Sequence, residues 1–112
     1  MKKIAIIGGG LNGLYTATLL EKEFDVTLFE ARERLGGRVC TIDGFDLGPS
    51  WVWPHQRRIL KLIESLGLQI IPQYTKGEAL YETPHKIERF APPPSAPSGR
   101  IQGGIGMLIE AL

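Results

Sequence analysis

The chain has 112 residues, of which 43% are hydrophobic and 22% charged, and its formal net charge is +1. This composition is typical of an ordinary globular domain, and so small a net charge provides no basic field for nucleic acid or anionic lipid. One cysteine excludes an internal disulfide, and only two histidines accompany it, so no metal site is predicted. No apolar run approaches the roughly 18 residues of a membrane span. We therefore expect a cytoplasmic protein without a membrane or nucleic-acid partner.

Residues 4–29 have the pattern of a strand, a helix and a second strand. Residues 4–7 are a continuous apolar run that stops at three glycines, which is typical of a strand covered on both faces in a parallel sheet. Apolar residues then recur at intervals of three and four over residues 12–24, which indicates an amphipathic helix. Residues 26–29 are the second apolar run. The three segments predict a βαβ unit with parallel strands and a right-handed crossover.

A loop and a β-hairpin are expected next. Residues 31–38 combine charged residues with glycine, and this composition favours a loop over a buried element. Residues 39–42 and 45–47 flank the pair Asp43-Gly44. This pair tolerates the positive φ angles of a type I′ turn, so the segment predicts a hairpin.

The remainder is predicted to contain one helix, short strands and a proline-rich connector. Pro54 can open a helix at its first turn and Gly67 can close it. Three short segments are candidate strands, at residues 69–71, 78–82 and 86–90. Four of the eight prolines lie between residues 91 and 99, as in an extended connector. We therefore predict a dinucleotide-binding domain at 1–90, a connector at 91–99, and at 100–112 the start of a further segment whose residues 105–112 open a helix.

Gly8, Gly10 and Gly13 match the pattern G-x-G-x-x-G between the first strand and the helix. In this motif the first glycine allows a tight turn, the second lets a diphosphate approach the backbone, and the third lets helix and strand pack closely. The free N–H groups and positive dipole at the start of the helix would face the diphosphate. Glycine triplets also make plain turns, so the motif depends on this strand-to-helix context.

Glu30 ends the second strand, about 20 residues after the glycine turn, where dinucleotide-binding proteins place an acidic residue. A carboxylate there accepts hydrogen bonds from both ribose hydroxyls and repels a 2′-phosphate, which argues against NADP. The alternative is an exposed carboxylate at a strand end. The fingerprint alone does not distinguish NAD from FAD.

The segment after Glu30 distinguishes the two cofactors. Glu30-Ala31-Arg32, followed by Leu35-Gly36-Gly37-Arg38-Val39-Cys40-Thr41, resembles the second glycine motif of flavoproteins. Paired glycines let N–H groups approach the diphosphate and ribityl parts of a longer cofactor, and arginines bind phosphate oxygens. A solvated charged loop, or a fragment of an NAD-dependent dehydrogenase, would leave the glycine pair unexplained.

With residues 45–54 and the predicted helix after them, the chain resembles the flavin-containing amine oxidase family, which includes monoamine and polyamine oxidases. Residues 100–112 are similar to the family's Arg-x-x-Gly-Gly-x-x-x-Leu segment. The resemblance implies an α/β fold with a Rossmann-like βαβ dinucleotide-binding unit and parallel sheet, plus a β-hairpin and a helix. This fold would be incomplete relative to the two-domain flavoprotein.

The resemblance also implies FAD as the cofactor and a set of cofactor-binding residues in the two glycine loops, at the strand end and near the flavin ring. They are Gly8, Gly10, Leu11, Asn12, Gly13, Glu30, Ala31, Arg32, Gly36, Gly37, Arg38, Gly48, Pro49, Ser50 and Trp51. Pro49 stands where the family has Gly or Ala, and it removes an N–H that could approach the flavin. Trp51 is either an aromatic wall for the flavin or part of the core. Cys40, His55 and His85 receive no role.

For the complete architecture the resemblance implies FAD-dependent oxidation of a C–N bond in a small amine. No residue of the chain resembles the family's catalytic lysine or its covalent cysteine, so no catalytic residue is assigned. We expect these 112 residues to recognise the ADP half of FAD without turning over an amine. One alternative is a non-catalytic remnant that self-associates through an exposed sheet edge or a swapped C-terminal segment. The other is an NAD-dependent dehydrogenase fragment.

Overall fold

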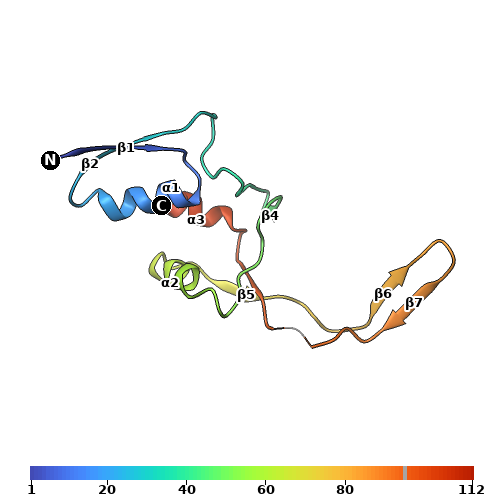
Figure 1. Ribbon diagram of the computed structural model, residues 1–112. Helices are drawn as coiled ribbons and strands as arrows, with labels where there is room; N and C mark the ends of the chain where they lie inside the picture. The colour runs from blue at the N-terminus through green and yellow to red at the C-terminus, as the bar shows by residue number, and fades with distance from the viewer. Residues whose placement is uncertain (95) are drawn as a thin grey trace.

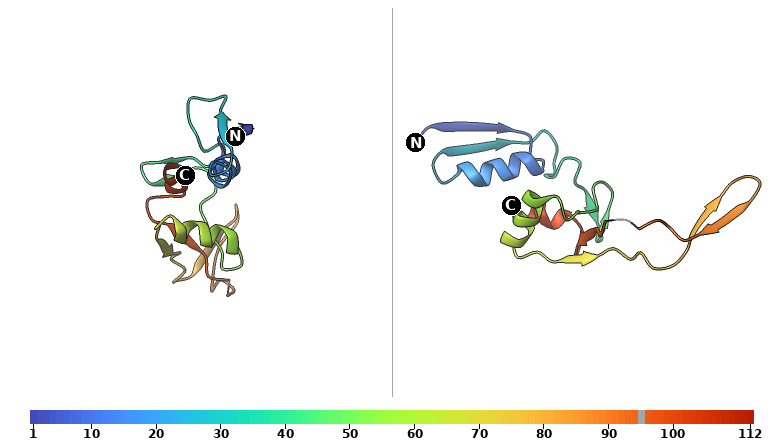
Figure 2. Two further views of the ribbon diagram at one scale, coloured as in Figure 1. Left: turned by 90° about the vertical axis from the view of Figure 1, so that its left-hand side faces the viewer. Right: turned by 60° about the horizontal axis from the view of Figure 1, so that its bottom comes forward.

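The computed structural model describes residues 1–94 and 96–112 (Figure 1). The chain is elongated, with principal extents of 64 × 28 × 22 Å, because a two-stranded arm formed by β6 (Ala79–Glu82) and β7 (Ile87–Phe90) projects from the rest (Figure 1). Figure 2 shows β1 and β2 on one side of α1 and α2 on the other, with α3 beside α1. The molecule is therefore a βαβ unit and a second, helix-containing lobe, with the arm attached to the latter.

The predicted βαβ unit is confirmed. β1 (Lys3–Ile7), α1 (Leu11–Leu20) and β2 (Asp25–Phe29) follow one another, and the two strands pair in parallel from Lys3–Asp25 to Ile7–Phe29. Side chains alternate between half-buried and exposed along both strands. This alternation shows that α1 covers one face of the pair.

The expectation that the first strand is covered on both faces is wrong. Ile7 is 80% exposed and its register partner Phe29 is 54% exposed. Both belong to the face that α1 does not cover. A continuous apolar run is compatible with burial of both faces of a strand. It does not show that other elements of the chain cover both faces.

The predicted hairpin forms from β3 (Thr41–Ile42) and β4 (Phe45–Asp46), which pair antiparallel. Asp43 has φ 52° and Gly44 has φ 80°, so both turn residues are in the positive-φ region expected of a type I′ turn. The strands are shorter than predicted.

The predicted helix is present as α2 (Arg57–Ser65), although it begins later than Pro54. The chain first makes a turn in which the Gln56 side chain accepts a hydrogen bond from the Trp53 N–H at 3.0 Å. Gly67 follows the helix with φ +68°, a conformation that suits glycine at a helix end.

The three predicted strand segments are present as β5 (Ile70–Pro72), β6 and β7, the last two forming the arm. A strand that the sequence did not suggest, β8 (Gly99–Ile101), pairs antiparallel with β5. Helix α3 (Gly106–Ala111) follows β8, within the helical segment expected at 105–112.

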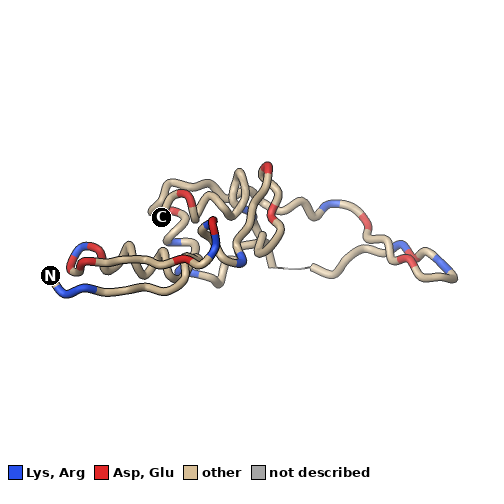
Figure 3. The backbone as a smooth tube through the Cα atoms, turned by 90° about the horizontal axis from the view of Figure 1, so that it is seen from above, with Lys and Arg blue, Asp and Glu red and all other residues tan. Residues whose placement is uncertain are grey.

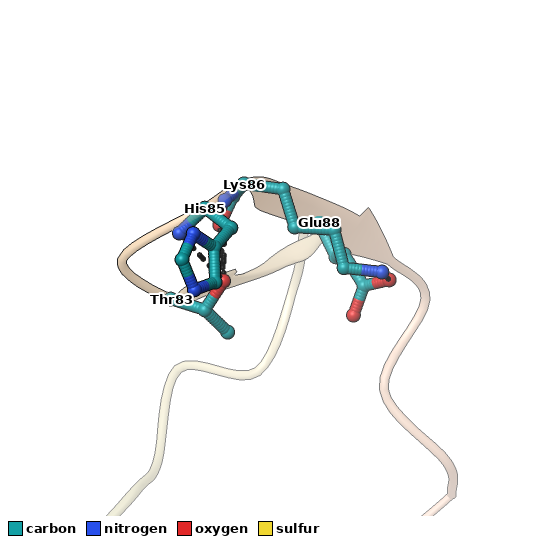
Figure 4. Close-up of polar contacts among 4 residues, drawn as sticks. All are labelled: Thr83, His85, Lys86 and Glu88. Atoms are coloured by element: carbon teal, nitrogen blue, oxygen red, sulfur yellow. Dashed lines mark hydrogen bonds and ion pairs between the residues drawn. The ribbon is translucent and has the colours of Figure 1, made fainter.

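The tip of the arm is closed by local hydrogen bonds (Figure 4). The Thr83 hydroxyl accepts the Lys86 N–H at 3.1 Å and the His85 N–H at 3.3 Å, and Lys86 forms an ion pair with Glu88. His85 therefore belongs to a self-contained turn.

The core lies in the second lobe. Its cluster of buried side chains consists of Val39, Val52, Ile63, Ile101, Ile105 and Leu108. Ile63 comes from α2 and Leu108 from α3, and both are almost completely buried. Half of the cluster thus comes from the last twelve residues, so the C-terminal segment is an integral part of this core.

Candidate dinucleotide-binding site

The glycine turn leads directly from β1 into α1. Gly8 has φ +102°, and Gly10 is extended at φ −76° and ψ 177° immediately before the helix. Within the part of the chain that the structure describes, no side chain caps the start of α1. The N–H groups of its first turn are therefore available to an anion, and the helix dipole favours negative charge at the same point.

Gly10 and Gly13 are glycines for different physical reasons. A Cβ at Gly13 would lie 2.0 Å from the Gly8 carbonyl oxygen, so only glycine permits this approach of helix to turn. A Cβ at Gly10 would have its nearest neighbour, the Gly36 carbonyl oxygen, at 3.8 Å, an ordinary contact. The protein itself has room for a side chain at Gly10, and the space above this residue can be filled by a ligand.

The second glycine pair lies against the first glycine turn. The Gly36 N–H donates to the Gly9 carbonyl at 2.7 Å, and a Cβ at Gly37 would lie 3.4 Å from the Gly10 Cα. Gly36 and Gly37 both have positive φ, at 111° and 62°. The Arg34 guanidinium fixes the loop internally by donating to the carbonyls of Gly37 at 2.7 Å and Val39 at 3.2 Å. Two motifs separated in sequence thus form one backbone surface.

Glu30 lies at the edge of this surface. Its Oε1 accepts the Arg32 N–H at 2.9 Å, and its Oε2 accepts the Gly9 N–H at 2.7 Å. These hydrogen bonds, with that from Arg32 the larger influence, lower the pKa of Glu30 below its ordinary value. A carboxylate has about four lone-pair sites, so the group stays ionised and retains acceptor capacity for hydroxyl donors.

A cleft of about 950 Å³ opens beside the two glycine loops, between α1 and α2. Eight residues of the predicted cofactor-binding set line it: Gly10, Leu11, Asn12, Arg32, Gly36, Gly37, Arg38 and Pro49. Five lining residues were not predicted: Tyr15, Val39, Arg58, Ile59 and Leu62. The lining contains three arginines and no carboxylate, so it presents positive charge over a mostly apolar floor.

The remaining predicted residues lie outside the cleft lining. Gly8 and Gly13 shape the turn, and Glu30 and Ala31 lie at the end of β2. Gly48 packs against Arg38, because a Cβ at Gly48 would lie 2.2 Å from the Arg38 carbonyl oxygen. Ser50 donates to the Gly48 carbonyl at 3.3 Å. The adenosine and diphosphate side of the predicted site is thus assembled more closely than the flavin side.

Trp51 is 54% exposed and packs edge-on against Trp53, with ring centroids 6.4 Å apart and an interplanar angle of 88°. It does not line the cleft and does not belong to the buried cluster. Its contact with a flavin stays a prediction.

One of the unpredicted lining residues could have been suspected from spacing. Tyr15 follows the predicted residue Leu11 by one helical turn, so the two share a helix face. No local pattern indicates that the face of α2 carrying Arg58 lies toward α1.

A polar link holds the C-terminal segment under the second loop. The Asp46 carboxylate accepts hydrogen bonds from the Thr41 hydroxyl at 2.6 Å and from the Ile105 N–H at 2.9 Å. The Thr41 oxygen in turn accepts the Gly106 N–H at 2.8 Å. A Cβ at Gly104 would lie 2.3 Å from the Thr41 side chain, which explains the second glycine of the Gly103-Gly104 pair.

Charges elsewhere are dispersed. Figure 3 shows Lys and Arg interspersed with Asp and Glu along the chain. Over residues 1–94 and 96–112, no group of three or more His, Cys, Asp or Glu side chains is arranged to hold a metal ion. In the same ranges, no helix has the length and apolar character needed to cross a membrane.

Comparisons with known proteins agree with this geometry. Residues 6–66 match the family described as NAD(P)-binding Rossmann-like domain. The chain is 42% identical over 92 residues to flavin-containing amine oxidase A of Canis lupus familiaris, covering 70% of this chain and 18% of that protein. It is 36% identical over 88 residues to putrescine oxidase of Kocuria rosea, covering 74% of this chain and 18% of that protein.

Solved structures give the same result. Wild-type putrescine oxidase bound to putrescine superimposes with a TM-score of 0.69 at 38% identity, over 80% of this chain and 21% of that one. Cyclohexylamine oxidase from Brevibacterium oxydans gives a TM-score of 0.69 at 27% identity, over 79% of this chain and 21% of that one. The chain spans about a fifth of the length of these relatives. It therefore belongs to the NAD(P)-binding Rossmann-like domain family and is similar to the N-terminal part of flavin-containing amine oxidases.

Proposed function

We propose that the chain binds FAD and forms the FAD-binding N-terminal region of an amine oxidase-like flavoprotein. The observation that carries the proposal is the meeting of three separate segments at one surface: the Gly8–Gly13 turn, the Gly36-Gly37 pair and the Glu30 carboxylate. Each has a distinct use for an adenine dinucleotide. Together they would contact the adenosine ribose, the diphosphate and the ribityl part of the cofactor that follows the diphosphate.

The chain's own residues fit such a group. The open space above Gly10 and the uncapped start of α1 would receive the diphosphate, with Arg32 and Arg38 donating to its oxygens. Among the described residues neither arginine forms an ion pair with a carboxylate, so their charge is available. Glu30 would accept the ribose hydroxyls while the Gly9 and Arg32 N–H groups hold it in place.

FAD is favoured over NAD by the second glycine loop. An NAD site needs only the first fingerprint, whereas Gly36, Gly37 and Arg38 line the same cleft as Gly10 and enlarge the surface available to a longer cofactor. The named relatives are flavin-containing amine oxidases and a putrescine oxidase, which also supports a flavin. In a complete protein a bound flavin would supply the chemistry of hydride acceptance from the C–H bond beside a substrate amine nitrogen, which oxidises the C–N bond, and the protein would orient the reacting groups. These residues would supply cofactor binding, and none of them is assigned a catalytic role.

Titration of the full chain with FAD and with NADH tests the proposal. We expect quenching of flavin fluorescence on binding, and displacement of FAD only by a large excess of NADH. Tighter binding of NADH would refute the choice of FAD, and absence of binding to either would refute the site.

A second candidate, a self-associating module, is favoured by the uncovered apolar surface. Ile7 and Phe29 are exposed on the sheet, and Leu80 and Ile87 are 62% and 65% exposed on the arm. Exposed strand edges and apolar faces promote association between chains. Light scattering over a concentration series, with and without FAD, distinguishes the two: a concentration-dependent dimer that ignores FAD supports the module.

A further inference from the structure

Arg58 is a cleft residue that the resemblance to flavoproteins did not assign. It is the second residue of α2 and lines the cleft together with Ile59 and Leu62. Gly10 of the first glycine turn and Arg38 of the second loop line the same cleft. Arg58 therefore contributes a cation from the α2 side, opposite the segments that carry the recognised motifs.

Within residues 1–94 and 96–112, Arg58 has no acidic partner. The two ion pairs of the described residues are both on the arm and do not include Arg58. The residues three and four positions from Arg58 are Pro54 and His55 before α2 and Lys61 and Leu62 on it, and none of them is acidic. The cleft lining has no carboxylate either. Three guanidinium groups thus share one cleft, and their mutual repulsion favours a bound anion.

We propose that Arg58 donates hydrogen bonds to the diphosphate of the bound dinucleotide, as a third cation beside Arg32 and Arg38. This inference rests on the proposed function. A guanidinium matches phosphate oxygens through two parallel N–H groups, a geometry that an ammonium does not reproduce. The diphosphate would then join α2 to the βαβ unit, so that cofactor binding draws on both lobes.

Isothermal titration of the full chain with FAD and with ADP tests this inference. Arg58→Gln should weaken binding of both ligands by roughly ten- to a hundredfold, the range for hydrogen bonds to charged groups. Arg58→Lys should restore part of the loss. The matched control is Arg57→Gln, because Arg57 is the exposed neighbour on α2 and does not line the cleft. Arg57→Gln should bind FAD and ADP within about twofold of the unmodified chain. This change is well below the loss expected on removal of a direct charged contact.

Ionic strength provides a readout that a purely structural role would not change. Salt screens exposed charges, so the loss in Arg58→Gln should be largest at low salt and should shrink at high salt. Circular dichroism melts check that each variant folds.

Three outcomes would overturn the inference. Binding of FAD and ADP that is unchanged in Arg58→Gln refutes the arginine contact and leaves the proposed function intact. A loss that is equal in Arg57→Gln, or independent of salt, assigns the effect to α2 stability. Absence of ligand binding in the unmodified chain refutes the proposed function, and this inference with it.

Discussion

The βαβ unit and the second lobe divide two tasks between them. The βαβ unit carries the first glycine turn and Glu30, yet Leu14 is its only buried hydrophobic side chain among the described residues. The second lobe contains the six-residue buried cluster but supplies the cleft mainly with side chains from α2 and the second loop. The first glycine turn and Glu30 therefore lie apart from the packing that stabilises the molecule, whereas the second loop, through Val39, belongs to that packing. The cleft between the βαβ unit and the second lobe should depend on both.

The greatest loss of stability is expected from a substitution in the core of the second lobe. Leu108→Ala removes a fully buried side chain from the cluster and should lower the free energy of unfolding by about 2–5 kcal/mol. Urea denaturation monitored by circular dichroism measures this loss. Leu19→Ala is the control, since Leu19 is 59% exposed on α1 and should change stability by less than about 0.5 kcal/mol. Equal losses in the two variants would contradict the division of tasks.

A smaller loss of stability is expected from a substitution in the βαβ unit. Gly13→Ala places a methyl group against the Gly8 carbonyl, and the displacement of the helix should cost about 1–3 kcal/mol of unfolding free energy. Chemical denaturation measures the cost, and flavin fluorescence should show weaker FAD binding in parallel. Unchanged stability would mean that α1 does not depend on this close approach.

Glu30→Gln tests the ribose contact with little change of shape. Loss of the charged acceptor should weaken FAD binding by roughly ten- to a hundredfold. Fluorescence titration measures the affinity. Glu33→Gln is the matched control, because Glu33 is an exposed carboxylate in the same loop with no hydrogen bond among the described residues. If both variants bind equally well, the ribose is held elsewhere.

Gly10→Ala should separate the effect on FAD binding from the effect on folding. The substitution has room in the protein, so stability should change by less than about 1 kcal/mol. The methyl group would occupy the path of the diphosphate, and FAD affinity should fall by about tenfold, or roughly 1.4 kcal/mol. Thermal melts and titration measure the two quantities. A stable variant that binds normally would show that the diphosphate does not pass over Gly10.

The smallest effect is the pH dependence of Glu30. Because its folded-state pKa is lowered, ionised Glu30 stabilises the folded state above the unfolded pKa, and the contribution is lost as pH falls through the folded pKa. NMR titration of the Glu30 carboxyl carbon should therefore show a midpoint below the ordinary glutamate value of about 4.3. In unfolded protein the midpoint should return to that value. A folded midpoint at or above it would contradict the two backbone hydrogen bonds.

The parts of the fold that could be predicted are those with local signals. The period of the apolar residues indicated α1, the three glycines indicated the turn, and Asp43-Gly44 indicated the hairpin, because each pattern acts within a few residues. The convergence of Gly10 with the Gly36-Gly37 pair followed from a resemblance, since neither segment alone indicates the other.

The parts that could not be predicted depend on contacts between distant segments. β8 pairs with β5 across the arm, and the Asp46 carboxylate meets the Ile105 N–H. Arg58 enters the cleft only because α2 packs where it does. The exposure of Ile7 likewise depends on what covers the sheet. None of these arrangements has a signature within its own short stretch of sequence.

The hydrogen bond from the Gly36 amide to the Gly9 carbonyl gives the site a built-in reporter. Amide protons that are held in this way exchange slowly with deuterated solvent until the structure opens locally. The exchange rate of the Gly36 amide would thus report how often the first glycine turn and the Gly36-Gly37 loop separate before any cofactor is added. A ligand that bridges the loops should slow that rate selectively, while the amides of the projecting arm keep exchanging as before.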